Sequence, residues 1–236
     1  MTRRASRHAR MTLAVWPTLL VIGLFISLQY GGLDLRVAHL FYDPALGRFP
    51  LRDNFWANQV FHDGARQVLV GLALLILVAW GLSWRVPALR RQRAALAYLT
   101  ITILLSMLLV QQLKSWTNVD CPWDVAGLGG LRPHINLFAD KPDTLPAGHC
   151  FPGGHSSGGF ALLALYFVGG VHRARRWPML LPGLLTGSVF AVDQWARGAH
   201  FPSHDLASAY LCWMVALGMA TLFERLGHPP QFKPPA

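Results

Sequence analysis

Charged residues are scarce in this sequence of 236 residues. They make up 14% of the chain, with only 11 acidic residues, whereas apolar residues make up 53%. A soluble domain carries about a quarter charged residues, so the composition excludes an ordinary soluble fold. The charges fall in clusters between long apolar runs, which predicts an all-α, polytopic membrane protein.

Six apolar segments have a length that suits a membrane span, for which about 20 residues are needed. They are residues 11–30, 67–84, 94–113, 158–171, 178–195 and 206–222. The fourth segment reaches that length only if it begins near His155, which places this histidine at the mouth of a helix. Internal repeats and low-complexity tracts are lacking, so residues 1–236 are predicted to form one domain, a bundle of six transmembrane helices.

The basic residues indicate the topology, because short cytoplasmic loops are enriched in Lys and Arg. They cluster in residues 1–10, 85–93, 173–176 and 225–236. Both termini are therefore expected in the cytoplasm, with residues 1–10 as a basic N-terminal segment and residues 226–236 as a tail. The formal net charge of +10 follows from this topology and does not indicate a nucleic-acid partner.

The first apolar run, residues 11–30, follows a basic start and so shares two features with a secretory signal peptide. It is too long for a typical signal core, and no small-x-small cleavage site follows it. We therefore expect it to remain as the first helix.

Two long segments are expected on the outer side, residues 31–66 and 115–149. In the first, residues 35–42 and 54–61 have aromatic and aliphatic side chains at helical spacing, which predicts short amphipathic helices at the interface, with a plain loop as the alternative. His62 and Asp63 are interpreted as a helix cap with solvated charges. The second segment is rich in Gly, Pro and Asp and is expected to be an ordered loop or lid.

Three polar stretches stand at the outer ends of predicted helices. They are KSWTNVDCP at residues 114–122, FPGGHSSG at 151–158 and ARGAHFPSHD at 196–205. Together they resemble the three-part motif of the type 2 phosphatidic acid phosphatase (PAP2) superfamily. That motif has a Lys followed by six residues and Arg-Pro, then Pro-Ser-Gly-His, then an Arg with a downstream His and Asp.

The resemblance implies a metal-independent phosphatase without a cofactor. His200 would attack phosphorus and form a phosphohistidine, and His155 would protonate the leaving oxygen. Lys114 and Arg197 would hold the phosphoryl oxygens. Gly153 and Gly154 would bring backbone N–H groups to an oxyanion at a helix N-terminus, and Ser156 would cap that helix or touch the phosphate.

The chain departs from the motif at four places. Cys121 stands in place of the first-motif Arg, and Gly153 in place of Ser. Gln194 stands in place of the third-motif Arg, but Arg197 is three residues on and shares its helix face. Asp193, four residues before Arg197, is expected to pair with it.

The fourth departure concerns the group that orients His200. The motif has an Asp four residues after this histidine, where the chain has His204, and Asp205 follows. Position favours His204 and chemistry favours Asp205, because a carboxylate also stabilises a phosphorylated imidazolium.

Cys121 and Cys150 flank the second outer segment and would face an oxidising compartment, where disulfides persist. A bridge between them would join the first motif to the second. Two free thiols are the alternative, and a metal site with His149 and His155 is a weaker one because the spacing is not typical of zinc.

The sequence thus predicts a lipid phosphatase of a bacterial inner membrane with its active site facing the periplasm or the outside. Its substrate would be a phospholipid, a polyprenyl (pyro)phosphate or lipid A. Three alternatives remain: a lipid transporter or flippase, a haem or metal carrier that uses His155 and His200, and a PAP2-like protein without activity.

Overall fold

The computed structural model describes residues 3–169 and 176–231, and these residues are mainly helical. Within them, extended pairing is limited to isolated bridges, as at Asp43 and Arg48. The longer helices are α1 (Arg3–Gln29), α3 (Ala65–Leu82), α5 (Arg93–Trp116), α9 (Leu181–Ala196) and α10 (Pro202–Arg225). The shorter ones are α2 (Leu33–Phe41), η1 (Trp56–Gly64), α4 (Pro87–Arg90), η2 (Pro122–Asp124), α6 (Gly154–Phe160), η3 (Ala161–Ala164), α7 (Leu165–Val168) and η4 (Pro178–Leu180). The predicted all-α class is confirmed.

Within the described residues, four helical stretches are long and apolar enough to cross a membrane. They are His8–Gln29, Trp56–Leu82, Arg93–Trp116 and Pro202–Arg225. The fourth and fifth predicted spans coincide with α6–η3–α7 and with η4–α9, which are helical but shorter. The count of six spans therefore remains a prediction. The end of the fourth span at residues 170–171, the basic residues Arg173 and Arg175, and residues 232–236 lie outside the described part of the chain.

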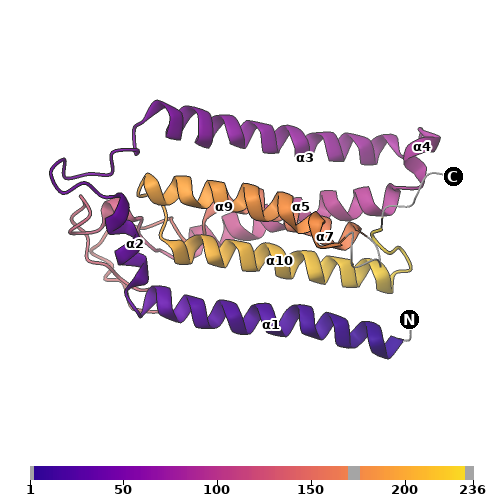
Figure 1. The fold of residues 1–236 in the computed structure, drawn as a ribbon, viewed down its shortest axis with the longest axis horizontal. Coiled ribbons are helices and arrows are strands. Elements are labelled where there is room, and N and C mark those ends of the chain that lie inside the picture. The colour runs from indigo at the N-terminus through magenta and orange to yellow at the C-terminus, as the bar shows by residue number, and fades with distance from the viewer. Residues whose placement is uncertain (1–2, 170–175, 232–236) are drawn as a thin grey trace.

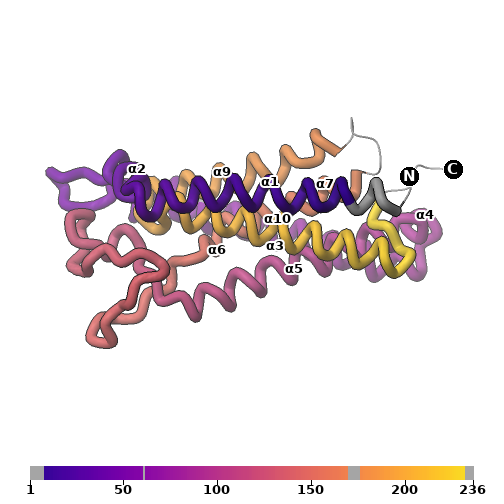
Figure 2. Tube along the Cα trace, turned by 90° about the horizontal axis from the view of Figure 1, so that it is seen from below, coloured from indigo at the N-terminus to yellow at the C-terminus, as the bar shows by residue number. Residues whose placement is uncertain are grey.

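The longer helices run side by side along the long axis of the molecule, with α1 and α3 on opposite flanks (Figure 1). Between them, α10 packs against α1, α5 and α6, and α3 packs against α5. The start of α1 and the end of α10 lie at one end of the bundle, where Arg10 forms an ion pair with Glu224. The long connections 30–64 and 117–153 lie at the opposite end (Figure 2).

The α6–η3 segment lies unusually close to α9 because glycines face each other there. A β-carbon at Gly159 would lie 2.5 Å from the backbone nitrogen of Gly187, and one at Gly183 would lie 2.5 Å from that of Leu163. Small residues let helix backbones approach in this way in membrane bundles. The contact fixes α6 and η3 relative to α9, and both α6 and α9 carry motif residues.

The two predicted interfacial helices have different outcomes. The first is present as the separate short helix α2. The second, η1, is a π-helix that continues directly into α3, because Gly64 and Ala65 both keep helical backbone angles. Residues 56–82 are thus one continuous helical stretch, and the second long helix begins earlier than the apolar run suggests.

Asp34, near the start of α2, fixes the start of α10. Its Oδ1 accepts a hydrogen bond from the Ser203 backbone N–H at 3.0 Å, and its Oδ2 accepts one from Gln29 Nε2 at 3.1 Å. A carboxylate at a helix N-terminus satisfies a free N–H group and matches the helix dipole. Burial raises the pKa of Asp34, and the bonds to Ser203 and Gln29 oppose that rise.

Candidate active site

The three motif stretches meet at the end of the bundle that holds the long connections. Lys114 is in the last turn of α5, Gly154 opens α6, and His200 lies between α9 and α10. Lys114 is half-buried, and its Nζ would lie 3.3 Å from a β-carbon at Gly154. The first two motifs are therefore in contact through these two residues.

Asn118 turns the chain away from α5 just after Lys114. Its φ of 52° is left-handed, a conformation that Asn tolerates better than most residues. Its Oδ1 accepts a hydrogen bond from the Gly148 N–H at 2.8 Å. This residue redirects the chain just after the end of α5 and also joins the two ends of the outer loop.

A disulfide joins Cys121 to Cys150, whose Cα atoms are 5.2 Å apart. The Cys150 N–H also donates to the Val119 carbonyl at 3.0 Å. Inside the loop, Asp120 forms ion pairs with Lys141, at 2.8 Å, and with Arg132. The outer loop is thus an ordered structure that ties the first motif to the second.

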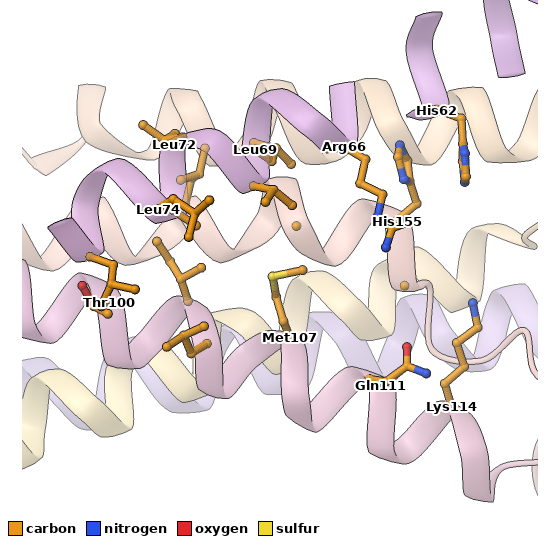
Figure 3. A pocket seen from close by; sticks show the side chains of 18 of the residues that line it. His62, Arg66, Leu69, Leu72, Leu74, Thr100, Met107, Gln111, Lys114 and His155 are labelled. Atoms are coloured by element: carbon orange, nitrogen blue, oxygen red, sulfur yellow. The ribbon is translucent and has the colours of Figure 1, made fainter. Parts of the chain in front are cut away.

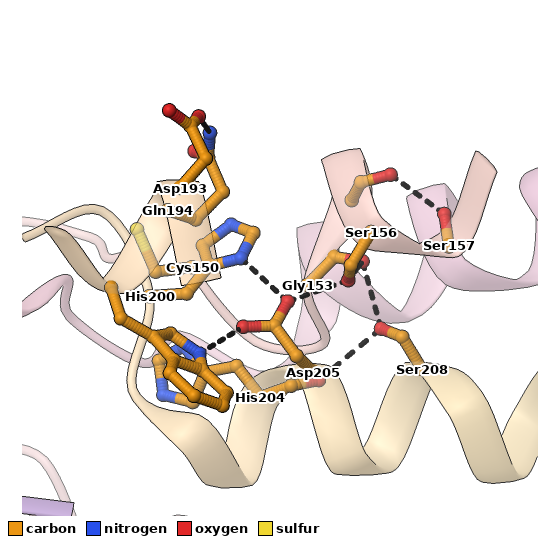
Figure 4. Close-up of polar contacts among 12 residues, drawn as sticks. Cys150, Gly153, Ser156, Ser157, Asp193, Gln194, His200, His204, Asp205 and Ser208 are labelled. Carbon is orange, nitrogen blue, oxygen red and sulfur yellow. Dashed lines mark hydrogen bonds and ion pairs between the residues drawn. The ribbon is translucent and has the colours of Figure 1, made fainter. Parts of the chain in front are cut away.

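His200 and Asp205 form a buried pair. His200 Nδ1 lies 2.8 Å from Asp205 Oδ1, and the two side chains are 4% and 2% exposed (Figure 4). Asp205 Oδ1 also accepts a hydrogen bond from Ser156 Oγ at 2.5 Å, and Oδ2 accepts one from Trp195 Nε1 at 2.7 Å. The carboxylate is therefore held by three donors from three different segments.

His204 occupies a different place. Its ring packs edge-on against Phe151 and Phe201, with centroids 5.4 and 5.5 Å away, and its centroid is 6.1 Å from that of His200. Of the two residues that the sequence left open, Asp205 is the one that contacts His200 Nδ1. The reason is that α10 begins at Pro202, which turns position 205 toward His200 and position 204 toward the aromatic rings.

Gly153 and Ser156 are bound to α10 rather than exposed to a substrate. The Gly153 N–H donates to the His204 carbonyl at 2.9 Å, and the Gly153 carbonyl accepts from Ser208 Oγ at 2.7 Å. The Ser156 hydroxyl is directed to Asp205. Gly154 is the residue of this turn that faces the cavity described next.

A cavity of about 490 Å³ leads from these residues along α3 and α5 (Figure 3). Its polar end is formed by His62, Arg66, Gln111, Lys114, Gly154, His155, Gln194 and His200. The rest is mostly apolar, with side chains such as Leu69, Leu74, Ile103, Leu104 and Met107. An apolar cleft with a few convergent polar groups is typical of a small-molecule binding site.

His62 and Arg66 reach this site from η1 and α3, which the sequence motifs do not include. The His62 ring is stacked on His155, with centroids 4.4 Å apart, and its Nδ1 is 2.9 Å from Asp63 Oδ1. The prediction of a simple helix cap missed this contact. One signal was present in the sequence, because positions 62 and 66 are one turn apart and share a helix face.

The sequence predicted that Arg197, rather than Gln194, would reach the phosphate site, and the structure shows the opposite placement. Gln194 lines the cavity, whereas the buried Arg197 donates to Asn58 Oδ1 at 2.8 Å. Asp193 accepts a hydrogen bond from Gln194 Nε2 at 2.8 Å, and no ion pair joins the described side chains of Asp193 and Arg197. Burial lowers the pKa of Arg197, while the negative charge of Asp193 opposes this.

Comparison with known protein families gives a match over the second half of the chain. The model of the PAP2 superfamily matches residues 95–227, which is more than half of the chain and includes all three motif stretches. Curated proteins and solved structures gave no match. Membership of this superfamily suggests phosphatase activity, and the apolar helices suggest a protein embedded in a membrane. With Lys114, Gly154, His155 and His200 lining one cavity and the family model matched across all three motif stretches, the chain belongs to the PAP2 superfamily.

Proposed function

We propose that this protein is an integral-membrane lipid phosphatase. It removes the phosphate of a phosphomonoester, or the terminal phosphate of a lipid pyrophosphate, at the outer leaflet of a bacterial inner membrane. The observation that carries the proposal is the cavity along α3 and α5, whose apolar part ends at His200, His155 and Lys114. A lipid tail fits the apolar part and a phosphate fits the basic end.

His200 is the nucleophile in this proposal. Since its Nδ1 is bound to Asp205, the Nδ1–H tautomer is favoured and the Nε2 lone pair is free to attack phosphorus. The new N–P bond replaces the P–O bond to the lipid, and Asp205 stabilises the phosphorylated imidazolium. This arrangement follows the same logic as the carboxylate and imidazole of a serine hydrolase.

His155 handles the protons. It lines the same cavity as His200, and it would give a proton to the leaving lipid oxygen in the first step. Water then attacks phosphorus while His155 accepts its proton, the N–P bond breaks, and inorganic phosphate leaves. No metal or other cofactor takes part in these steps.

Cations at the phosphoryl oxygens stabilise the charge of the transition state. Lys114 is the first, because it lines the cavity beside Gly154. The sequence predicts Arg197 as the second, because it shares a helix face with the motif position 194, but in the structure its guanidinium donates to Asn58 Oδ1. The cavity lining adds Arg66 as a further candidate that the motif does not contain.

Phosphate release from purified protein in detergent tests this proposal. The substrates should include phosphatidic acid, phosphatidylglycerol phosphate, a polyprenyl pyrophosphate and lipid A, each with and without EDTA. We expect release from at least one lipid that EDTA does not change, and a 32P-labelled protein band that is absent in His200→Ala. Activity lost in EDTA and restored by a divalent ion would overturn the metal-free mechanism.

A further inference from the structure

The space next to Gly153 is filled by the carboxylate that binds His200. A β-carbon at position 153 would overlap Asp205 Oδ1, and it would come within 2.9 Å of Ser156 Oγ and 3.0 Å of His200 Nδ1. Heavy atoms do not approach that closely without a shift of one partner. The question is therefore whether the backbone at Gly153 or the Asp205 carboxylate could move aside.

The backbone at Gly153 is fixed on both sides. Its N–H is bonded to the His204 carbonyl at 2.9 Å, and its carbonyl to Ser208 Oγ at 2.7 Å. Both partners belong to α10, the helix that also carries Asp205. A shift of Gly153 would break two buried hydrogen bonds, which is unfavourable because each leaves an unsatisfied polar group.

The carboxylate is fixed as well, but by side chains. Its donors are His200 Nδ1, Ser156 Oγ and Trp195 Nε1. A side chain at position 153 would therefore displace the carboxylate from His200 before it displaced the backbone. The arrangement that satisfies all of these groups leaves no room for a β-carbon at position 153.

We propose that Gly153 is a positioning residue. Two departures from the motif, the Gly at position 153 and the acid at position 205, then form one coupled exchange. In the motif that the chain resembles, position 153 is Ser and the acid is at position 204. Here the acid is one residue later and approaches His200 through the volume that a serine side chain would use. Ser156, one turn into α6, supplies the hydroxyl that holds the displaced carboxylate.

This inference rests on the proposed function only for its consequence in catalysis. If His200 is the nucleophile, a displaced Asp205 leaves its imidazole in a mixture of tautomers and orientations. We then expect Gly153→Ala to lower kcat by about 100-fold, as a misplacement of about 1 Å does, with little change of KM. The coupling itself can be measured without any enzymatic assay.

The test is a double-mutant cycle of thermal stability with Gly153→Ala, Asp205→Ala and the combined variant. We expect Gly153→Ala to lower the Tm in the wild-type background and to have little effect in the Asp205→Ala background, where the carboxylate is gone. The matched control is Gly218→Ala on α10, since a β-carbon there meets no heavy atom within 4 Å. Because Ala is a better helix former than Gly, it can raise the Tm, but the change should be the same in both backgrounds.

A second readout is the 15N spectrum of histidine-labelled protein, with His200 assigned from its loss in His200→Gln. Gly153→Ala should shift the His200 signals in the same direction as Asp205→Asn. An equal loss of Tm in both backgrounds, or His200 signals unchanged by Gly153→Ala, would overturn the coupling. If the coupling is found but no lipid is hydrolysed, the proposed function fails and the coupled exchange stands.

Discussion

His62 lies flat against His155, with ring centroids 4.4 Å apart and planes inclined by 20°. On another side, Phe190 packs against His155 at 4.7 Å. The ring that we propose as the proton donor is thus held between an aromatic side chain of α9 and a histidine of η1. Its orientation depends on a segment that the family motif does not contain.

The first prediction follows from this stack. Replacing His62 by Ala removes an aromatic contact that is worth about 0.5–1.5 kcal/mol, so we expect kcat to fall by up to about tenfold. His62→Phe keeps the ring and should retain most of the activity. The control is His39→Ala, because His39 is exposed on α2. Equal losses in His62→Ala and His62→Phe would show that the ring nitrogens, and not the stacking, matter.

The second prediction separates Asp205 from His204. Asp205→Asn should lower kcat by about 10⁴-fold, as the loss of the orienting carboxylate does in serine hydrolases. His204→Phe should lower the Tm but change kcat little. His204 packs among aromatic rings, and within the described site it is Asp205 that bonds to His200. Steady-state kinetics together with thermal unfolding measure both effects. A larger loss of kcat in His204→Phe than in Asp205→Asn would reverse the assignment.

The third prediction concerns the exchanged positions 194 and 197. Arg197→Gln should reduce transition-state stabilisation by ~2–4 kcal/mol if this guanidinium serves the phosphate. Adding Gln194→Arg should then restore much of the activity, because position 194 lines the cavity. The measurement is kcat/KM for one lipid substrate in the single and double variants.

A double variant no better than Arg197→Gln would assign Arg197 to its contact with Asn58 instead. Arg66→Gln, measured in parallel, should then show the larger loss of kcat/KM. Arg85→Gln at the other end of the bundle is the control for a general effect of removing a positive charge.

The fourth prediction tests the apolar part of the cavity. Met107→Trp should fill the space between α3 and α5 and raise the KM for long-chain substrates several-fold, since Met107 lines the cavity. A short-chain phosphate ester should be hydrolysed as before. Leu108→Trp is the matched control, because the neighbouring side chain is 67% exposed on the surface of the same helix. If both substrates lose activity equally in Met107→Trp, the cavity does not hold the tail.

The fifth prediction concerns the disulfide. Cys121→Ser and Cys150→Ser should each lower the free energy of unfolding by about 3–4 kcal/mol at most, as expected for a bridge that closes a loop of this size. The double variant should be no less stable than either single one. Mass spectrometry of the unreduced protein should detect the cross-linked peptide, and two alkylated thiols in the native protein would contradict the bridge.

The long apolar runs predicted the helical class and six spans, and four of these coincide with helical stretches of spanning length in the described part of the chain. They did not predict that the segment from Gly154 to Val168 is interrupted by the 3-10 turn η3. Glycine-to-backbone packing against α9 decides that geometry, and no hydropathy pattern contains it. Residues 62 and 66 were missed for a similar reason, since their neighbours in space are distant in sequence.

The choice between His204 and Asp205 shows how a one-residue shift limits inference from a motif. On a helix, adjacent residues point about 100° apart, so the choice depends on where α10 begins. Pro202 at the first position and the Asp34 carboxylate on the Ser203 N–H fix that start. The second of these contacts joins residues that lie far apart in the sequence.

The bond from the Ser203 N–H to Asp34 shows that the site depends on residues before the part of the chain that the family model matches. A fragment cut to residues 95–227 would keep all three motif stretches. It would lose Asp34 and Gln29, which contact Ser203 at the start of α10. It would also lose η1 and α3, which carry the cavity residues His62 and Arg66. The first third of the chain is therefore a working part of the site and not a mere membrane anchor for it.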